Sequence, residues 1–333
     1  MSNKNIIPVF IGGCERSGTS FLASMLGNHP NYITTPECQI KTKLTNLLDW
    51  SQPIDQKKIG SAIQFMNHHF RFLIWDTVLN KEDYLNSTEE FSLRSLIEYT
   101  VKQYAQQRHN KTNPLVWFDH DPYSLKHRKT ILEHFPDARF IHMVRDGRAV
   151  ATSIMPLDWG PNTIYHAAHF YRKSVSYGLE AEKELPKHQI TRVKYEDLIK
   201  NPSKELKKIC NWLDIEFIPD MLNSKGFIPP KYTRGQHRKV NQKADIKKIT
   251  SWKQKLNKKQ IKIFESIAGK LLNQLEYEHL MPKSTPPNKI RQYIFRLRES
   301  YLEKKNKKYM RERKKWGLSQ LNRDIPPIEN IMF

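Results

Sequence analysis

The chain has 333 residues and a mass of 39.5 kDa, and its 38% hydrophobic and 11% aromatic residues suffice for one large core or two small ones. This composition excludes a disordered protein. The formal net charge of +22 predicts an anionic partner and leaves open a nucleotide, an anionic glycan, an acidic peptide, nucleic acid or a membrane surface.

The first predicted element is a short strand that leads into a phosphate-binding loop. The apolar run 9–11 favours a buried strand, and the glycines that follow it permit tight turns. A helix is expected from Phe21, with Ser17 or Thr19 as its cap. Backbone amides at such a helix start point towards an anion.

This loop departs from that of the nucleoside triphosphatases at one position. Residues 13–20 have the spacing G-x-x-x-x-G-K-[ST], but Thr19 stands where the lysine should be. Arg16 instead supplies a planar cation that suits phosphate or sulfate oxygens, which favours a ligand without a triphosphate. A plain turn with an exposed arginine is the alternative. The candidate ligand contacts here are Arg16, Ser17, Gly18, Thr19 and Ser20.

A carboxylate follows the first helix. The run 31–36 should return the chain past the mouth of the loop and present Glu37 there, either as a general base or as an ordinary acidic residue at a helix start. Helical periodicity then recurs over 39–50, 59–72 and 91–109, separated by polar linkers. We expect these helices to form an insertion that frames an acceptor pocket.

Another strand is predicted over 115–119. It should end beside the phosphate-binding loop, in the crevice at the carboxyl ends of parallel strands where ligands bind. His120 follows it directly. With an ordinary pKa of about 6.5, a histidine there can act as a base or, when protonated, donate a hydrogen bond. The alternative is a histidine that is merely hydrogen-bonded at a strand end.

The run 140–144 predicts a strand that ends at Arg145, and Asp146 is a natural cap for the next helix. Ser153 lies two helical turns after Arg145 and can add a hydroxyl contact. Arginines at two strand ends can hold two separate phosphates of one nucleotide, whereas a surface charge cluster is the alternative interpretation.

Strands and helices continue to alternate. Helices from Ser124 and Ile164 and a strand over 190–194 predict an α/β fold, a parallel sheet like that of P-loop proteins with helices on both faces. Tyr195 ends this strand and either contacts a nucleotide base or belongs to the core. A further helix should follow Pro202.

A proline-bearing linker over 282–287 predicts a boundary between an α/β domain, 1–281, and a basic extension, 282–333. The segment 289–316 mixes apolar residues with dense lysine and arginine, which indicates a basic amphipathic helix. Such a helix can lie on an anionic membrane, hold a polyanionic substrate, or pack on the domain through one apolar stripe.

Cysteine and histidine spacing give further expectations. The three cysteines, Cys14, Cys38 and Cys210, form no C-x-x-C pair and favour a reducing compartment. His166 and His169 should lie on the surface of a helix, and we expect no bound metal. The first strand begins almost at the start of the sequence, and no run approaches the roughly 18 apolar residues of a membrane span. We therefore expect a cytoplasmic protein.

Two of these segments together resemble the sulfotransferases that use 3′-phosphoadenosine-5′-phosphosulfate (PAPS). The loop CERSGTS, 14–20, is similar to that family's 5′-phosphosulfate-binding loop, and FIHMVRDGRAVATSIM, 140–155, to its 3′-phosphate-binding segment. The resemblance covers about 8–213 and, more faintly, 238–253.

Within that family the chain looks most like the protein-tyrosine sulfotransferases. This likeness rests on DHDPYSLKHRKTILEHFPDARFIHMVRDGR from Asp119, HPNYITTPE from His29 and VKYEDL from Val193. Animal members are anchored in membranes of the secretory pathway, and this sequence looks like a bacterial cytoplasmic relative.

The resemblance implies roles for the candidate residues. Arg16 and its loop would bind the 5′-phosphosulfate, and Arg145 with Ser153 the 3′-phosphate. Tyr195 would contact the adenine, and Glu37 would be the catalytic base. Sulfuryl transfer needs such parts because charge builds on the bridging oxygen as it leaves sulfur, so positioning and fixed positive charge do most of the catalysis.

Three positions depart from the tyrosine-sulfating enzymes. His120 stands where they have a lysine, Gln39 where they have an arginine near the substrate, and Leu157 where they have a basic residue near the 3′-phosphate. The acceptor hydroxyl therefore stays open between a protein tyrosine and a glycan or glycolipid.

We accordingly expect a metal-independent enzyme that moves sulfuryl from PAPS to an acceptor hydroxyl and leaves adenosine 3′,5′-bisphosphate. The expected partners are the acceptor, a membrane surface contacted through the basic helix, and a second copy in a homodimer, but not nucleic acid. The alternatives are a P-loop kinase that uses Mg-ATP, or a non-catalytic basic protein that binds nucleic acid or membranes.

Overall fold

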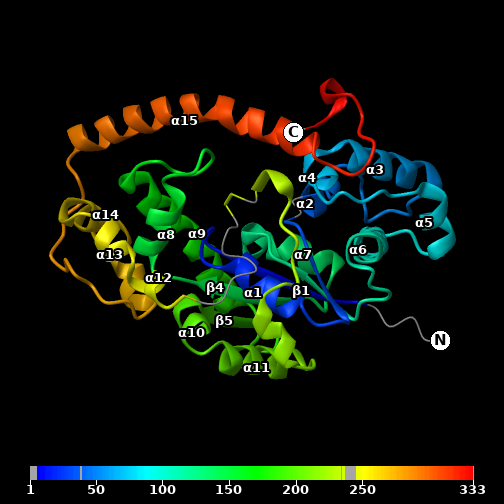
Figure 1. Cartoon of the computed structure of the whole chain (residues 1–333), viewed down its shortest axis with the longest axis horizontal. Helices are drawn as coiled ribbons and strands as arrows, with labels where there is room; N and C mark the ends of the chain where they lie inside the picture. Colours follow the sequence, from blue (N-terminus) through cyan, green and yellow to red (C-terminus); the bar gives the residue numbers. More distant parts are fainter. Residues whose placement is uncertain (1–5, 38–39, 234, 237–244, 333) are drawn as a thin grey trace.

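The computed structural model describes residues 6–37, 40–233, 235–236 and 245–332, and at its centre lies one parallel sheet (Figure 1). The strand order is β2-β3-β1-β4-β5, so the predicted parallel α/β sheet is confirmed. The edge strand β2 was not anticipated. The strands are β1 (Ile7–Gly13), β2 (Tyr32–Thr35), β3 (Val116–Asp119), β4 (Arg139–Val144) and β5 (Ile190–Lys194).

The register brings three strand ends to one edge of the sheet. Gly13 at the end of β1 pairs with Met143 of β4, and Phe10 of β1 pairs with Asp119 of β3. His120 and Arg145, the residues that follow β3 and β4, therefore leave the sheet beside the loop after β1. This edge is the crevice that the alternation of strands and helices predicted.

Alternate residues of β1 enter two different cores, as the period of two in a strand requires. Val9 and Ile11 pack in a cluster with α1 (Thr19–Leu26), α10 (Tyr195–Lys200) and α11 (Pro202–Leu213). Phe10 faces the opposite cluster, which includes Phe140, Trp117 and residues of the helices inserted between β2 and β3. Helices thus cover both faces, as expected.

The insertion between β2 and β3 is helical, but its bounds differ from those predicted. The predicted helix over 59–72 breaks at His69, which has an extended backbone and caps the next helix by accepting from the Arg71 amide at 3.2 Å. The helix expected over 39–50 is short. The inserted helices are α2 (Ile40–Leu44), α3 (Gln56–His68), α4 (Phe70–Leu73), α5 (Lys81–Ser87) and α6 (Leu93–His109).

The remaining helices complete the layers around β4 and β5. A helix expected from Ser124 is instead a 3-10 turn, Pro122–Leu125, followed by α7 (Arg128–His134). Asp146 caps its helix as predicted, accepting from the Arg148 amide at 2.9 Å. The other helices are α8 (Gly147–Ile154), α9 (Ile164–Glu184), α12 (Lys247–Thr250), α13 (Trp252–Lys255) and α14 (Lys258–Gln274), with 3-10 turns at Pro219–Asn223, Lys231–Thr233 and Ile328–Asn330.

The long C-terminal helix α15 (Lys289–Leu318) crosses the molecule from the side of α13 and α14 to the inserted helices (Figure 1). Glu299 accepts from the amides of Asn162 and Thr163 at 2.6 and 2.9 Å, and Arg313 donates twice to Asp158 at 2.9 Å. In the described ranges, no helix is both long and apolar enough to cross a membrane. The proposed division after residue 281 stays a prediction.

Candidate active site

A cavity of about 210 Å³ lies at the carboxyl ends of β1 and β4 and is bordered by residues from distant parts of the chain. The loop after β1, the insertion and α15 all contribute to its wall. The lining residues are Glu15, Arg16, Gly18, Thr19, Ser20, Phe21, Glu37, Arg71, Pro122, Arg145, Ser153, Trp159, Tyr195, Ile199, Tyr232, Thr233, Gln236, Asp245, Lys248, Met310, Arg313 and Lys314.

The loop after β1 adopts backbone conformations that favour glycine. Gly18 has φ 101° and Gly13 has φ 147°, and a Cβ on Gly13 would lie 2.3 Å from the Met143 carbonyl oxygen. Arg16 also has a positive φ, 70°, which is costly for a residue with a side chain and typical of functional loops. The strained backbone of the loop thus positions the Arg16 side chain.

The expected capping of α1 is wrong. The helix begins at Thr19, and its N-cap is Gly18, with no side-chain cap. Gly18 has a left-handed backbone, and no side-chain hydroxyl bonds to the first amides of the helix. Gly18, Thr19 and Ser20 line the cavity at this helix start. Ser17 is fully buried and does not line it.

The two predicted arginines and the serine lie together. Arg16 Nε donates to Ser153 Oγ at 3.1 Å, and Arg145 Nη1 donates to the Arg16 carbonyl oxygen at 3.0 Å. Burial and then the charge of Arg145 lower the pKa of Arg16. Within the described residues Arg145 Nε has no hydrogen-bond partner, although the side chain is only 6% exposed and lines the cavity. A buried cation with a spare donor fits an anionic ligand.

Tyr195 packs in the core, which is one of its two predicted roles, and it also lines the cavity. The Arg145 guanidinium carbon lies 4.3 Å from the centre of its ring, a cation–π contact. A Cβ on Gly18 would approach the same ring to 2.5 Å. The close packing of loop and ring therefore requires a glycine at this position.

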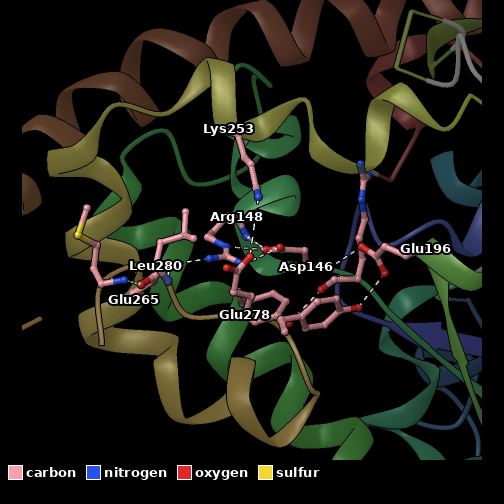
Figure 2. Close-up of polar contacts among 11 residues, drawn as sticks. Asp146, Arg148, Glu196, Lys253, Glu265, Glu278 and Leu280 are labelled. Atoms are coloured by element: carbon pink, nitrogen blue, oxygen red, sulfur yellow. Dashed lines mark hydrogen bonds and ion pairs between the residues drawn. The ribbon is translucent and has the colours of Figure 1, made fainter. Parts of the chain in front are cut away.

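A buried polar network holds the strand end that carries Arg145 (Figure 2). Arg148 binds the Asp146 carboxylate at 3.0 and 2.8 Å and Glu265 of α14 at 2.6 Å, while Glu196 accepts from the Asp146 amide at 3.0 Å. Glu265 also accepts from two amides after α14, those of Leu280 and Met281. Every carboxylate here has partners, which fixes the backbone next to Arg145.

Glu37 lines the cavity beside His120, whose Nδ1 lies 3.7 Å from Glu37 Oε1 and 3.4 Å from Ser20 Oγ. Burial and repulsion from Asp121 raise the pKa of Glu37 to about 8, against the opposing charge of Arg71. His120 is 1% exposed and does not line the cavity, so it lies behind Glu37 and Ser20. A carboxyl group with such a pKa is suited to proton transfer near neutral pH.

The sequence reasoning missed several lining residues. Glu15 stands next to Arg16, and burial followed by repulsion from Asp121 raises its pKa to about 7 against a hydrogen bond from Tyr123. Its place in the loop was a signal that could have identified it. Three further cations come from the insertion and α15, where no local pattern marks them; they are Arg71, Arg313 and Lys314.

Some positions singled out in the sequence do not reach the cavity. Leu157 packs against the core around α8 and α9 and is not a lining residue. Gln39 and Cys38 fall outside the described residues. Cys14 and Cys210 are buried free thiols. Among the described residues, no group of three histidine, cysteine, aspartate or glutamate side chains is placed to hold a metal ion.

The comparisons with known proteins agree on one family. A model described as the sulfotransferase family matches residues 8–219. A protein-tyrosine sulfotransferase of Drosophila melanogaster is 24% identical over 234 residues, which cover 68% of this chain and 42% of the fly protein. Protein-tyrosine sulfotransferase A of Caenorhabditis elegans is 22% identical over 289 residues, 84% of this chain and 69% of the worm protein.

A solved structure has a similar fold. The sulfotransferase domain from the Synechococcus PCC 7002 olefin synthase superimposes with a TM-score of 0.55 at 21% identity, over 84% of this chain and 98% of that domain. At this identity the similarity speaks to the fold alone. The chain spans less than half the length of the fly relative.

Proposed function

Because this chain belongs to the sulfotransferase family, we propose that it transfers a sulfuryl group from PAPS to an acceptor hydroxyl. The observation that carries the proposal is the cluster of Arg16, Arg145 and Ser153 at the ends of β1 and β4. Its spare buried donor, Arg145 Nε, fits a phosphate oxygen, and the start of α1 adds backbone amides beside it.

We assign the residues of the nucleotide site as follows. Arg145 and Ser153 would hold the 3′-phosphate, and the loop with Arg16 the 5′-phosphosulfate. Tyr195 would lie against the adenine, because its ring already lines the cavity beside Arg145. In this assignment Arg16 gives up its hydrogen bond to Ser153 when the ligand binds, and its charge then faces the bridging oxygen.

Glu37 acts as the general base in this proposal. Its carboxylate takes the acceptor's hydroxyl proton while the acceptor oxygen bonds to sulfur and the bond from sulfur to the 5′-phosphate oxygen breaks. Positive charge from Arg16 offsets the charge that develops on that oxygen. His120, behind Glu37, holds it in place rather than touching the reacting atoms.

A tyrosine phenol is the acceptor we propose first. Two considerations support it: the curated relatives named above are protein-tyrosine sulfotransferases, and the acidity of the acceptor matters for a carboxylate base. The pKa of a phenol, about 10, lies about two units above the pKa of Glu37, whereas an aliphatic hydroxyl is a far weaker acid. A glycan or glycolipid hydroxyl is the alternative acceptor.

Calorimetric titration with adenosine 3′,5′-bisphosphate in EDTA tests the nucleotide site. We expect metal-free binding that is lost in Arg145→Ala and kept in Arg172→Ala, a matched change at an exposed arginine of α9. A preference for Mg-ATP would contradict the proposal and favour a phosphotransferase.

Transfer of labelled sulfate from PAPS tests the acceptor. A peptide with one tyrosine, the same peptide with phenylalanine, and a neutral oligosaccharide serve as acceptors. Label on the tyrosine peptide alone is expected. Label on the oligosaccharide alone would exclude the phenolic acceptor while leaving sulfuryl transfer in place.

A further inference from the structure

The outer face of α15 exposes large apolar side chains that belong to none of the hydrophobic clusters in the described part of the chain. Five of them, on about three turns of the helix, are between 54% and 72% exposed. Their spacing of three and four residues places them on one side of the helix. They are Ile290, Tyr293, Ile294, Leu297 and Tyr301, and we call them the outer stripe.

The opposite face of the same turns is fixed to the protein. Glu299 lies two residues from both Leu297 and Tyr301, which is about 200° around the helix and therefore on the far side. It is 4% exposed and accepts from the amides of Asn162 and Thr163 at the start of α9. The outer stripe consequently cannot turn inward while this contact holds, and Figure 1 shows α15 at the edge of the molecule.

Positive charge surrounds the stripe. Between 289 and 318 the helix has twelve lysine or arginine residues and three glutamates, so its net charge is +9. Ten of these cations are exposed: Lys289, Arg291, Arg296, Arg298, Lys304, Lys305, Lys307, Lys308, Arg311 and Lys315. An apolar stripe flanked by exposed cations is the pattern of helices that lie in the plane of a membrane interface.

We propose that α15 docks on an anionic lipid bilayer, with the outer stripe in the acyl boundary and the flanking cations on the headgroups. Nucleic acid or an anionic glycan would satisfy the cations but offers nothing to Ile290, Ile294 and Leu297. A second copy of the chain would bring two helices of like charge together. The bilayer alone complements both features.

This docking does not depend on sulfuryl transfer, but it bears on it. Arg313, which lines the cavity, lies sixteen residues after Leu297, or about 24 Å along the helix. This distance runs along the helix and therefore along the membrane plane, so a docked helix would hold the cavity, which Arg313 lines, close to the membrane surface. An acceptor carried on or near a membrane would meet the site without free diffusion through solution.

Vesicle flotation of the full chain tests the proposal. Vesicles of phosphatidylcholine with about 30% phosphatidylserine are compared with phosphatidylcholine alone, at about 0.1 M salt. Ile294→Ser with Leu297→Ser removes the two central apolar side chains of the outer stripe and leaves the charge unchanged. Val78→Ser, at a 49% exposed site of the insertion, is the control. Circular dichroism and adenosine 3′,5′-bisphosphate binding report whether each variant is folded.

We expect binding only to the anionic vesicles, a loss of about tenfold or more in the double variant, and no loss in the control. Equal vesicle binding by wild type and double variant would overturn the proposal, since charge alone would then suffice. Binding to heparin or DNA without vesicle binding would assign the surface to a polyanion instead. A dimer that the double variant abolishes would assign it to a second copy.

Discussion

Replacement of Glu265 tests most directly how the fold holds Arg145, the arginine that we propose for the 3′-phosphate. This carboxylate is 3% exposed and receives a hydrogen bond from Arg148 Nη1 at 2.6 Å, together with the amides of Leu280 and Met281 at 3.2 and 2.6 Å. Glu265→Ala removes all three acceptor contacts at once. It leaves Arg148 with Asp146 as its remaining carboxylate partner.

Breaking a buried ion pair by removing one partner costs about 3–5 kcal/mol. The amides of Leu280 and Met281 are only partly buried and can turn to water, so losing their acceptor adds little to this cost. Because Arg148 keeps both bonds to Asp146, we expect Glu265→Ala to lower the free energy of unfolding by about 4 kcal/mol. Glu265→Gln keeps the volume, but one of its amide protons must face another donor, so we expect a smaller loss of about 2 kcal/mol.

Urea unfolding monitored by tryptophan fluorescence measures both losses. Glu276→Gln is the control, because Glu276 pairs with Lys194 at 2.6 Å yet its side chain is 83% exposed, and we expect no measurable change there. A loss below about 1 kcal/mol for Glu265→Ala, at an unchanged dependence on urea, would refute the reasoning that this network is a buried, fully paired unit.

Three further results are expected. Glu37→Gln should lower kcat by about 10²- to 10⁴-fold. The wild-type rate should rise with pH through about 8, because the base must lose its proton. A Glu37→Gln variant that keeps this rise in its pH–rate profile would exclude Glu37 as the base. The same raised pKa means that the folded state holds a proton that the unfolded state releases near 4.5, so thermal stability should fall between these two values, and Glu37→Gln should flatten that fall in a melting series over pH. Gly18→Ala should weaken binding of adenosine 3′,5′-bisphosphate in calorimetry and cost about 1–2 kcal/mol of stability, since the site has φ 101° and a Cβ would lie 2.5 Å from the Tyr195 ring; unchanged affinity would show that the loop can relax.

Much of the fold follows from local sequence. The apolar runs of β1, β4 and β5 are long enough to be recognised as buried strands, and Asp146 caps its helix because its side chain reaches the Arg148 amide. The strand β2 was missed because its four residues, YITT, lie at the sheet edge and end in two threonines, so they form no apolar run like that of β3. The break at His69 coincides with a bridge between His69 and Met332, in which the Met332 amide donates to the His68 carbonyl oxygen and the Phe70 amide to that of Met332.

The candidate site also has residues that local sequence predicts and residues that it does not. Arg16, Arg145 and Ser153 sit in motifs whose spacing carries information, and the register of the sheet then brings them together. The opposite wall has no such signature, because Arg71 and Lys314 lie more than two hundred residues apart in the sequence. Only the path of α15 across the molecule makes them neighbours (Figure 1).

The path of α15 has a consequence for how specificity can be exchanged. Arg71 lies close enough to influence the pKa of both Glu37 and Lys314, so this helix borders the region of the cavity that we assign to the acceptor. The phosphate loop lies at the other end of the chain. Grafting a different helix after residue 288 would therefore change the wall that Arg313 and Lys314 supply, while the sequence of the loop that carries Arg16 stays the same.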